Sequence, residues 1–229
     1  MTTNSDENML DLAFAVQGRD LPRTHRAALA KALQRALPWL AEGGAAVHRL
    51  NVVAGGDGAK VLLSGRTRLT LRLPRERVAE ATAALSGATL QVAGSTLRLG
   101  AAQVRELLPF GTLYAHFVAA AGGADGADAG DEAAFIAEVQ RALAALGVSA
   151  RVICGRHQRL EPGRSEGQGE GSEEQGEGAG ALGGYGLMLD GLSRGDSRRV
   201  LEHGIGAHRL WGCGVFVPHK SAAAVGMPD

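Results

Sequence analysis

The feature that most constrains the fold is an order of strand and helix patterns that the sequence runs through twice. Strands are expected where apolar and polar residues alternate, and helices where apolar residues recur every three or four positions. In the first half these patterns predict a strand at 9–16, a helix from Asp20 to Gly43, strands at 46–53 and 69–73, a helix at 75–86 and strand-like sequence from residue 89. In the second half they predict a strand at 112–119, a helix from Asp131 to Gly147, strands at 148–158 and 184–190, a helix from Ser193 to Gly204 and a strand at 215–218.

Each half therefore has the order β-α-β-β-α-β, which is the order of the ferredoxin-like (RRM-like) domain. In such an α+β domain, two helices cover one face of a four-stranded antiparallel sheet. We predict two tandem ferredoxin-like domains, at residues 1–104 and 105–229. Asp20 is expected to cap the first helix, with Pro22 in its first turn and an apolar stripe of four leucines: Leu29, Leu33, Leu37 and Leu40.

An acidic, glycine-rich segment at residues 161–182 interrupts the second half. Residues 161–180 hold six glutamates and seven glycines but no large apolar residue, so they cannot bury enough surface to offset the entropy of ordering. We predict a disordered insertion in a hairpin loop, where added length costs little. The insertion also hides the charge of the remainder, which has five more basic than acidic residues although the whole chain is neutral.

Composition and length exclude several classes of protein. The sequence begins MTTNSDENML, which does not resemble a secretory signal, and no stretch is long and apolar enough to span a membrane. Two cysteines 59 positions apart form neither a disulfide framework nor a zinc knuckle. With only five Phe, two Trp and two Tyr, an aromatic platform for base stacking is a poor first hypothesis. We expect a soluble, reduced, cytoplasmic protein without a membrane partner.

The richest candidate site is the stretch HGIGAHRLWGCGVFVPHK at residues 203–220. Its spacing does not match G-x-G-x-x-G or a P-loop. Glycines let backbone N–H groups approach a phosphate closely, and an arginine among them adds a forked cationic donor. The stretch is therefore either a nest for an RNA backbone or a glycine-rich turn without a ligand. The residues that would bind RNA here are Gly204, Gly206, Arg209, Gly212 and Gly214.

A resemblance to a known family rests on an ordered series of motifs. GYGLMLDGLS, LEHGIG and AHRLWGCGVFVPHKS resemble the C-terminus of the CRISPR-associated endoribonucleases that process repeat RNA, the Cas-six group of the RAMP superfamily, and most closely its MYXAN-subtype branch. LAFAVQGRDLPRTHRAAL, LPWL, VHRL and RTRLTLRLP resemble the opening of that branch, and LLPFGTLYAHFV and VICGRHQ resemble its middle. The resemblance spans essentially the whole chain except the acidic segment.

The resemblance implies cleavage of precursor repeat RNA without a metal. The ribose 2′-hydroxyl would attack the adjacent phosphate, giving a 2′,3′-cyclic phosphate, a 5′-hydroxyl and mature guide RNA. The residues agree, because no carboxylate, histidine or cysteine cluster has metal-ligand spacing. We expect no cofactor, repeat RNA as partner in a basic cleft between the domains, and further subunits of a type I CRISPR interference complex as possible partners.

Without a metal, a group of near-neutral pKa must move the proton, and histidine is the obvious choice. The resemblance implies a catalytic histidine at or just after the first helix, which fits His25 and His48. His25 falls in the first turn, where the helix N-terminus lowers the pKa of an imidazole. We favour His25, and an ordinary structural histidine is the alternative at either position.

Basic residues elsewhere are candidates for RNA contact. Lys220 follows the last strand, and Arg194, Arg198 and Arg199 crowd the last helix, which is otherwise a solvated charged face. Arg66, Arg68 and Arg72 alternate with Leu69 and Leu71, so they form either a stripe that follows phosphates or the solvent side of a half-buried sheet. Two other functions stay open: a non-catalytic subunit that holds the RNA hairpin, and a ferredoxin-like nucleotide-binding module.

Overall fold

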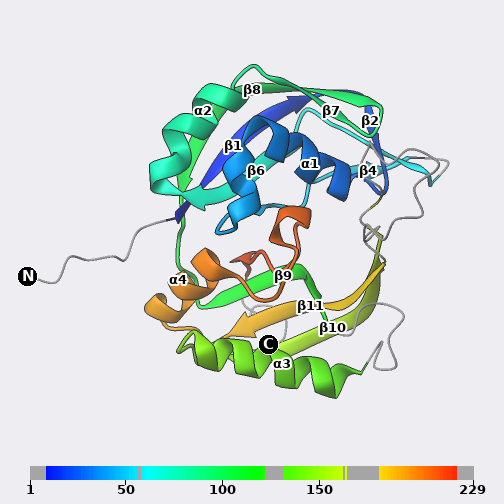
Figure 1. Cartoon of the computed structure of the whole chain (residues 1–229). Helices are drawn as coiled ribbons and strands as arrows, with labels where there is room; N and C mark the ends of the chain where they lie inside the picture. Colours follow the sequence, from blue (N-terminus) through cyan, green and yellow to red (C-terminus); the bar gives the residue numbers. More distant parts are fainter. Residues whose placement is uncertain (1–8, 56–57, 122–130, 162, 164–180, 221–229) are drawn as a thin grey trace, which may run out of the picture. The chain divides into compact units, whose positions relative to one another are not determined.

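The computed structural model describes residues 9–55, 58–121, 131–161, 163 and 181–220, which form two compact units (Figure 1). The boundary between the units falls between Glu106 and Leu107. The insertion predicted at 161–182 lies almost wholly outside the described residues, and strand β11 begins at Leu182. No helix of the described part is long and apolar enough to cross a membrane. Each unit is described by itself.

The N-terminal unit is built on a five-stranded antiparallel sheet in the order β3-β6-β1-β8-β7. Without β7, this is the ferredoxin-like order, in which the first strand lies between the third and the fourth. The strand-like sequence from residue 89 forms a hairpin that adds β7 as an edge. The strands are β1 (Met9–Gln17), β3 (Ala46–Val47), β6 (Arg68–Pro74), β7 (Thr89–Val92) and β8 (Ser95–Glu106), and the helices are α1 (Arg26–Ala36) and α2 (Val78–Leu85).

The alternation of leucines on β1 and β6 forms the centre of this unit's core. Leu10, Leu12 and Phe14 pair in register with Leu73, Leu71 and Leu69, and all six side chains are buried. Burying a side chain of this size contributes roughly 1.5–3 kcal/mol relative to leaving it in water. These cross-strand pairs therefore fix the register, because a slip by one residue would expose the whole row.

The predicted start of the first helix is wrong. Asp20 does not cap it, because Asp20–Pro22 forms the short strand β2, which pairs with β5 (Lys60–Leu62) beside β4 (Val53–Ala54). Burial of Leu21 in this small sheet overrides the local capping signal, and Asp20 contacts Lys60 at 3.2 Å. The N-cap of α1 is instead His25.

The first helix also ends earlier than predicted. The residue before a proline is pushed out of the α-helical region, and Leu37, which precedes Pro38, has φ −136°. A short 3₁₀ helix follows at Pro38–Glu42. The predicted stripe is nevertheless buried, because Leu37 and Leu40 are buried like Leu29 and Leu33.

The predicted arginine stripe is wrong at Arg72. The alternation on β6 does place Arg68 and Arg72 opposite the leucines, but Arg72 is only 1% exposed. It lies opposite Asp11 on β1 and donates to both carboxylate oxygens of Asp11, at 2.8 and 3.0 Å. Arg72 is therefore buried, neutralises a half-buried carboxylate and is not available to follow phosphates.

The C-terminal unit has the four-stranded antiparallel sheet order β10-β11-β9-β12, which again is the ferredoxin-like order. Both halves of the chain thus have the predicted fold. The strands are β9 (Thr112–Ala119), β10 (Arg151–Leu160), β11 (Leu182–Asp190) and β12 (Val217–Pro218), and the helices are α3 (Glu132–Ala145) and α4 (Arg194–His203).

Both helices of this unit begin where the sequence predicts. The side chain of Asp131 accepts a hydrogen bond from the Ala134 N–H, and that of Ser193 accepts one from the Asp196 N–H. Each cap satisfies a backbone donor that the first helical turn leaves without an intrahelical partner. On α3, Phe135 is buried and stacks on Tyr185 of β11, with ring centroids 4.6 Å apart.

Candidate functional site

The stretch from Gly204 to Gly214, here the glycine loop, connects α4 to the last strand through a turn that only glycines adopt easily. Gly204, Gly206, Gly212 and Gly214 all have φ between 63° and 80°. Such left-handed conformations cost a residue with a Cβ roughly 1–2 kcal/mol. His208 is a non-glycine residue in the same region, with φ 60°.

Two of the glycines also allow the ends of the loop to touch. The Ile205 N–H donates to the Gly214 carbonyl oxygen at 3.2 Å, and the Gly214 N–H donates to Phe117 on β9 at 2.8 Å. A Cβ at Gly214 would collide with the carbonyl oxygen of Ile205, and one at Gly204 would collide with that of Gly214. Close backbone packing therefore accounts for Gly204 and Gly214 without any ligand.

The outer turn of the glycine loop differs from its base. Gly206, Ala207 and His208 are exposed. Within the described part of the chain, their peptide N–H groups donate to no protein acceptor. Successive free N–H groups around a left-handed residue form a concave binding surface for an anion. Ala207 and His208 were not among the sequence candidates, because no side-chain property signals a free peptide N–H.

Arg209 stabilises the glycine loop from inside. It is half-buried, and its Nη2 donates to the carbonyl oxygen of Glu202 in the last turn of α4 at 2.9 Å. A cation at this position also interacts favourably with the negative end of the helix. Arg209 therefore has a structural role in the loop, whether or not it also contacts a ligand.

Trp211 anchors the glycine loop to the sheet. It packs on a cluster of Phe117, Ala119 and Cys213, and its ring stacks on His208 with centroids 4.5 Å apart. Burial lowers the pKa of the His208 imidazole. Trp211 is thus mainly a core residue.

His25 occupies the N-cap of α1 and is 7% exposed. Its Nδ1 lies 2.8 Å from the carbonyl oxygen of Pro22. A carbonyl oxygen can only accept, so this hydrogen bond places the proton on Nδ1 and leaves the lone pair on Nε2. Burial, and secondarily the charge of Arg26, lower the pKa of His25, against the opposing effect of the Pro22 and Arg23 carbonyls. The sequence predicts this direction but attributes it to the helix terminus.

His48 has a different environment, next to the ion pair of Asp11 and Arg72. Its Nε2 lies 3.1 Å from Oδ1 of Asp11, the same carboxylate that Arg72 binds. Burial alone would raise the pKa of Asp11, but hydrogen bonds and charges from His48 and Arg72 hold it well below its usual range. The Nε2 of His48 therefore donates to a carboxylate.

The remaining cationic candidates differ in their exposure to solvent and in their hydrogen bonds to the protein. Arg194 and Lys220 are exposed in the C-terminal unit, whereas Arg198 is half-buried on α4. Arg199 binds Asp196 and the carbonyl oxygen of Gly147.

In the N-terminal unit, Arg66 is exposed in the turn before β6, and Arg68 donates to the carbonyl oxygens of Gly65 and Thr67, at 2.8 and 2.9 Å. The structure thus places the glycine-loop residues together, and both histidine candidates with Arg66 and Arg68 in the other unit.

A cluster of rings on β9 was not predicted. Tyr114 is half-buried and contacts His116 edge-on at 5.0 Å and His219 at 5.6 Å. The alternation in TLYAHFVA places Tyr114 and His116 on the face opposite Leu113 and Ala115, and this alternation was the available signal. Tyr114 is therefore partly packed and partly open to solvent.

No group of three histidine, cysteine or carboxylate side chains in the described residues lies close enough together to hold a metal ion.

Comparison with known proteins identifies the family. The family model described as Cas6 Crispr matches residues 10–221. The chain belongs to the Cas6 family. A curated Cas6 relative, the CRISPR-associated endonuclease Cas6 of Myxococcus xanthus (strain DK1622), is 38% identical over 217 residues, which cover 94% of this chain and 84% of the relative. The resemblance predicted from the sequence motifs is confirmed.

Solved Cas6 structures share the fold. A CRISPR-associated protein Cas6 superposes with a TM-score of 0.59 at 10% identity, covering 93% of this chain and 100% of that chain. A Cas6-related protein of Pyrococcus furiosus superposes with a TM-score of 0.58 at 9% identity, covering 91% and 98%. At such low identity the likeness establishes the fold only. It agrees with the two ferredoxin-like strand orders found in the present chain.

Substitution can separate two reasons for glycine in the loop, the left-handed backbone and the close contact between backbone segments. We expect Gly214→Ala to lower the free energy of unfolding by about 1 kcal/mol more than Gly147→Ala does. Both residues have φ 63°, but a Cβ at Gly147 meets open space whereas one at Gly214 meets Ile205. Urea denaturation of both variants measures the difference. Equal losses would mean that the left-handed backbone alone requires Gly214.

Proposed function

We propose that this Cas6 family member is a metal-independent endoribonuclease that cleaves CRISPR repeat RNA in its precursor transcript, with His25 as general base. The observation that carries the proposal is the hydrogen bond from His25 Nδ1 to the Pro22 carbonyl oxygen, at 2.8 Å. A buried, neutral imidazole held in this way presents an unprotonated Nε2 at neutral pH. The name of the Myxococcus xanthus relative, an endonuclease, supports the reaction class.

In the proposed reaction, Nε2 of His25 takes the proton of the ribose 2′-hydroxyl as O2′ attacks the adjacent phosphorus. The bond from phosphorus to O5′ then breaks, and the leaving oxygen takes a proton from the solvent. The His25 imidazolium then returns its proton to the solvent. The products are a 2′,3′-cyclic phosphate and a 5′-hydroxyl, so atoms and charge balance without a metal or cofactor. A positioned general base contributes roughly 10²–10⁴-fold to such a rate.

His25 is better suited to this role than His48. The Nε2 of His48 donates to Asp11, whose carboxylate also binds Arg72. Because this Nε2 uses its proton to donate to the carboxylate, it has no lone pair with which to accept the ribose proton. We therefore assign His48 a structural role in the N-terminal unit and keep it as the alternative base.

RNA binding is assigned to the glycine loop and the exposed cations. The free N–H groups of Gly206, Ala207 and His208 fit one phosphate. Three exposed cations can contact successive phosphates of the RNA: Arg194, Lys220 and Arg66. The other three are only partly exposed, so only part of each guanidinium could contact RNA: Arg68, Arg198 and Arg209. We further expect the processed RNA to pass to other subunits of a type I CRISPR interference complex.

The proposed function predicts cleavage that needs the 2′-hydroxyl but no divalent ion. The protein in EDTA should cut its repeat RNA once, and should not cut a copy with 2′-deoxyribose at the cleavage position. Gel analysis and mass spectrometry of the upstream fragment should find a 2′,3′-cyclic phosphate.

Three other outcomes would contradict the proposal. Cleavage only with added Mg²⁺ would exclude the metal-free route. Binding without cleavage would identify a non-catalytic RNA subunit, and absence of binding at modest salt would favour a nucleotide-binding module.

The histidine assignment predicts different effects of two substitutions. His25→Ala should lower the single-turnover rate by roughly 10²–10⁴-fold, with an RNA dissociation constant near that of the unmodified protein. Because burial lowers the pKa of His25 from its ordinary value of 6.5, the rate of the unmodified enzyme should fall with decreasing pH about a midpoint below 6.5.

His48→Ala serves as the matched control in this experiment. It removes one partner of Asp11 and should reduce the free energy of unfolding, with the cleavage rate of the folded protein changed less than tenfold. A loss of rate with His48→Ala and not with His25→Ala would reverse the assignment. Full rate in both variants would show that neither histidine is the base.

A further inference from the structure

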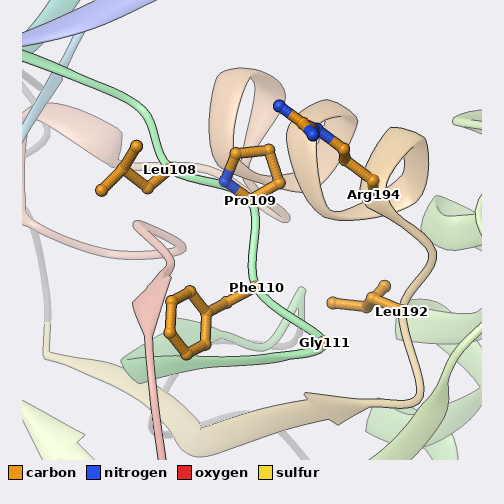
Figure 2. Close-up of a pocket in the computed structure, with 6 residues that line it drawn as sticks. All are labelled: Leu108, Pro109, Phe110, Gly111, Leu192 and Arg194. Carbon is orange, nitrogen blue, oxygen red and sulfur yellow. The ribbon is translucent and has the colours of Figure 1, made fainter.

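A hollow of about 440 Å³ opens in the C-terminal unit between the segment Leu108–Gly111 and the start of α4 (Figure 2). This is within the size range of small-ligand sites. Neither the assigned histidines nor the glycine loop contributes to it. Its lining residues are Leu108, Pro109, Phe110, Gly111, Leu192 and Arg194.

Two large apolar side chains that line the hollow are exposed to solvent. Leu108 is 66% exposed and Phe110 is 51% exposed, and Figure 2 draws both leaving the same segment. Exposed apolar surface that lines a concavity is typical of a binding site. An aromatic ring in particular offers a flat face for stacking.

The segment that carries these side chains is held in place. The Phe110 N–H donates to Oγ of Ser197, a fully buried residue of α4, at 2.8 Å. The carbonyl oxygen of Gly111 accepts from the Leu192 N–H at 3.0 Å, and Pro109 restricts the backbone between the two exposed residues. A ligand would therefore meet a preformed surface and lose little free energy to ordering it.

Arg194 adds a positive charge to the hollow. It is the first residue of α4, where the helix dipole disfavours a cation. The carboxylates nearest in sequence are otherwise engaged, Asp196 with Ser193 and Arg199, and Asp190 with Thr112 and Arg151. Among the described residues, Arg194 forms no ion pair.

We propose that this hollow binds one unpaired nucleobase of the RNA, stacked on Phe110, with the phosphate beside that base on Arg194. The inference rests on the proposed function and adds a base-binding site to it. A nucleotide has a flat aromatic base and, a few ångströms away, a charged phosphate. The hollow offers matching groups: the ring of Phe110, the apolar side chain of Leu108 and the guanidinium of Arg194. Unpaired bases flank or cap an RNA hairpin, so such a site gives sequence or position selectivity that phosphate contacts cannot.

The test is a double-mutant cycle between protein and RNA. The probe is the repeat RNA with 2′-deoxyribose at the cleavage position, in which each unpaired base is removed in turn. For the unmodified protein, one abasic position should raise the dissociation constant roughly 5- to 100-fold. Phe110→Ala should raise it by a similar factor with intact RNA, and the same abasic position should then have no further effect.

Matched variants separate stacking from folding and from general hydrophobicity. Phe110→Trp should keep the affinity, whereas Phe110→Leu should lose most of it, because leucine has no flat face. Leu62→Ala, which truncates an exposed apolar residue on β5, should have no effect. Arg194→Gln should reduce the salt dependence of binding by about one phosphate contact, and Arg141→Gln on α3 should not.

The proposal is overturned if no abasic position couples to Phe110, or if Phe110→Leu binds like the unmodified protein. In that event, cleavage of the repeat RNA by the unmodified protein would show that the proposed function stands and only the base-binding site is wrong. If the unmodified protein neither binds nor cuts the RNA, the proposed function itself fails. Unchanged thermal unfolding of Phe110→Leu confirms that a loss of affinity is not a loss of fold.

Discussion

The assignment of a catalytic role depends on one hydrogen bond, from Nδ1 of His25 to the carbonyl oxygen of Pro22. It decides which ring nitrogen carries the proton, and burial keeps the ring neutral by lowering its pKa. The bond exists because Asp20–Pro22 is a strand, so the chain turns between Pro22 and the N-cap of α1. If Asp20 capped the helix, Pro22 would lie in the first turn, and its carbonyl oxygen would accept a hydrogen bond within the helix instead of one from His25.

The two units use the same topology for different purposes. In the N-terminal unit, Asp11, Arg72 and His48 form a network on the sheet. Loss of Asp11 alone would leave the buried charge of Arg72 without its partner. In the C-terminal unit, polar and cationic groups remain available to a ligand: three peptide N–H groups in the glycine loop, and Arg194 in the hollow that Phe110 also lines. In the proposed function, the first unit would supply the proton acceptor, and the second would supply most of the binding surface.

Local patterns predicted the fold well where local interactions determine it. Asp131 and Ser193 cap helices as expected, and the leucines of β1 and β6 are buried in register. The failures share a cause, which is contact with residues distant in sequence. Pairing with β5 makes Asp20 part of a strand, and Asp11, 61 positions from Arg72, buries an arginine that alternation placed on an open face. At the candidate site, the sequence named His25 and the glycines as candidates, and these remain predictions. Neither the Pro22 hydrogen bond nor the free N–H groups have a signature in residue type.

The central claim is that His25 is a neutral base with its proton on Nδ1, and nitrogen NMR of the histidine rings tests it most directly. In ¹⁵N-labelled protein, with His25→Ala used to assign the resonances, the His25 ring should show the Nδ1–H tautomer and titrate below pH 6.5. An Nε2–H tautomer, or a pKa at or above 6.5, would contradict the account, because the nitrogen assigned to accept the ribose proton would already carry one.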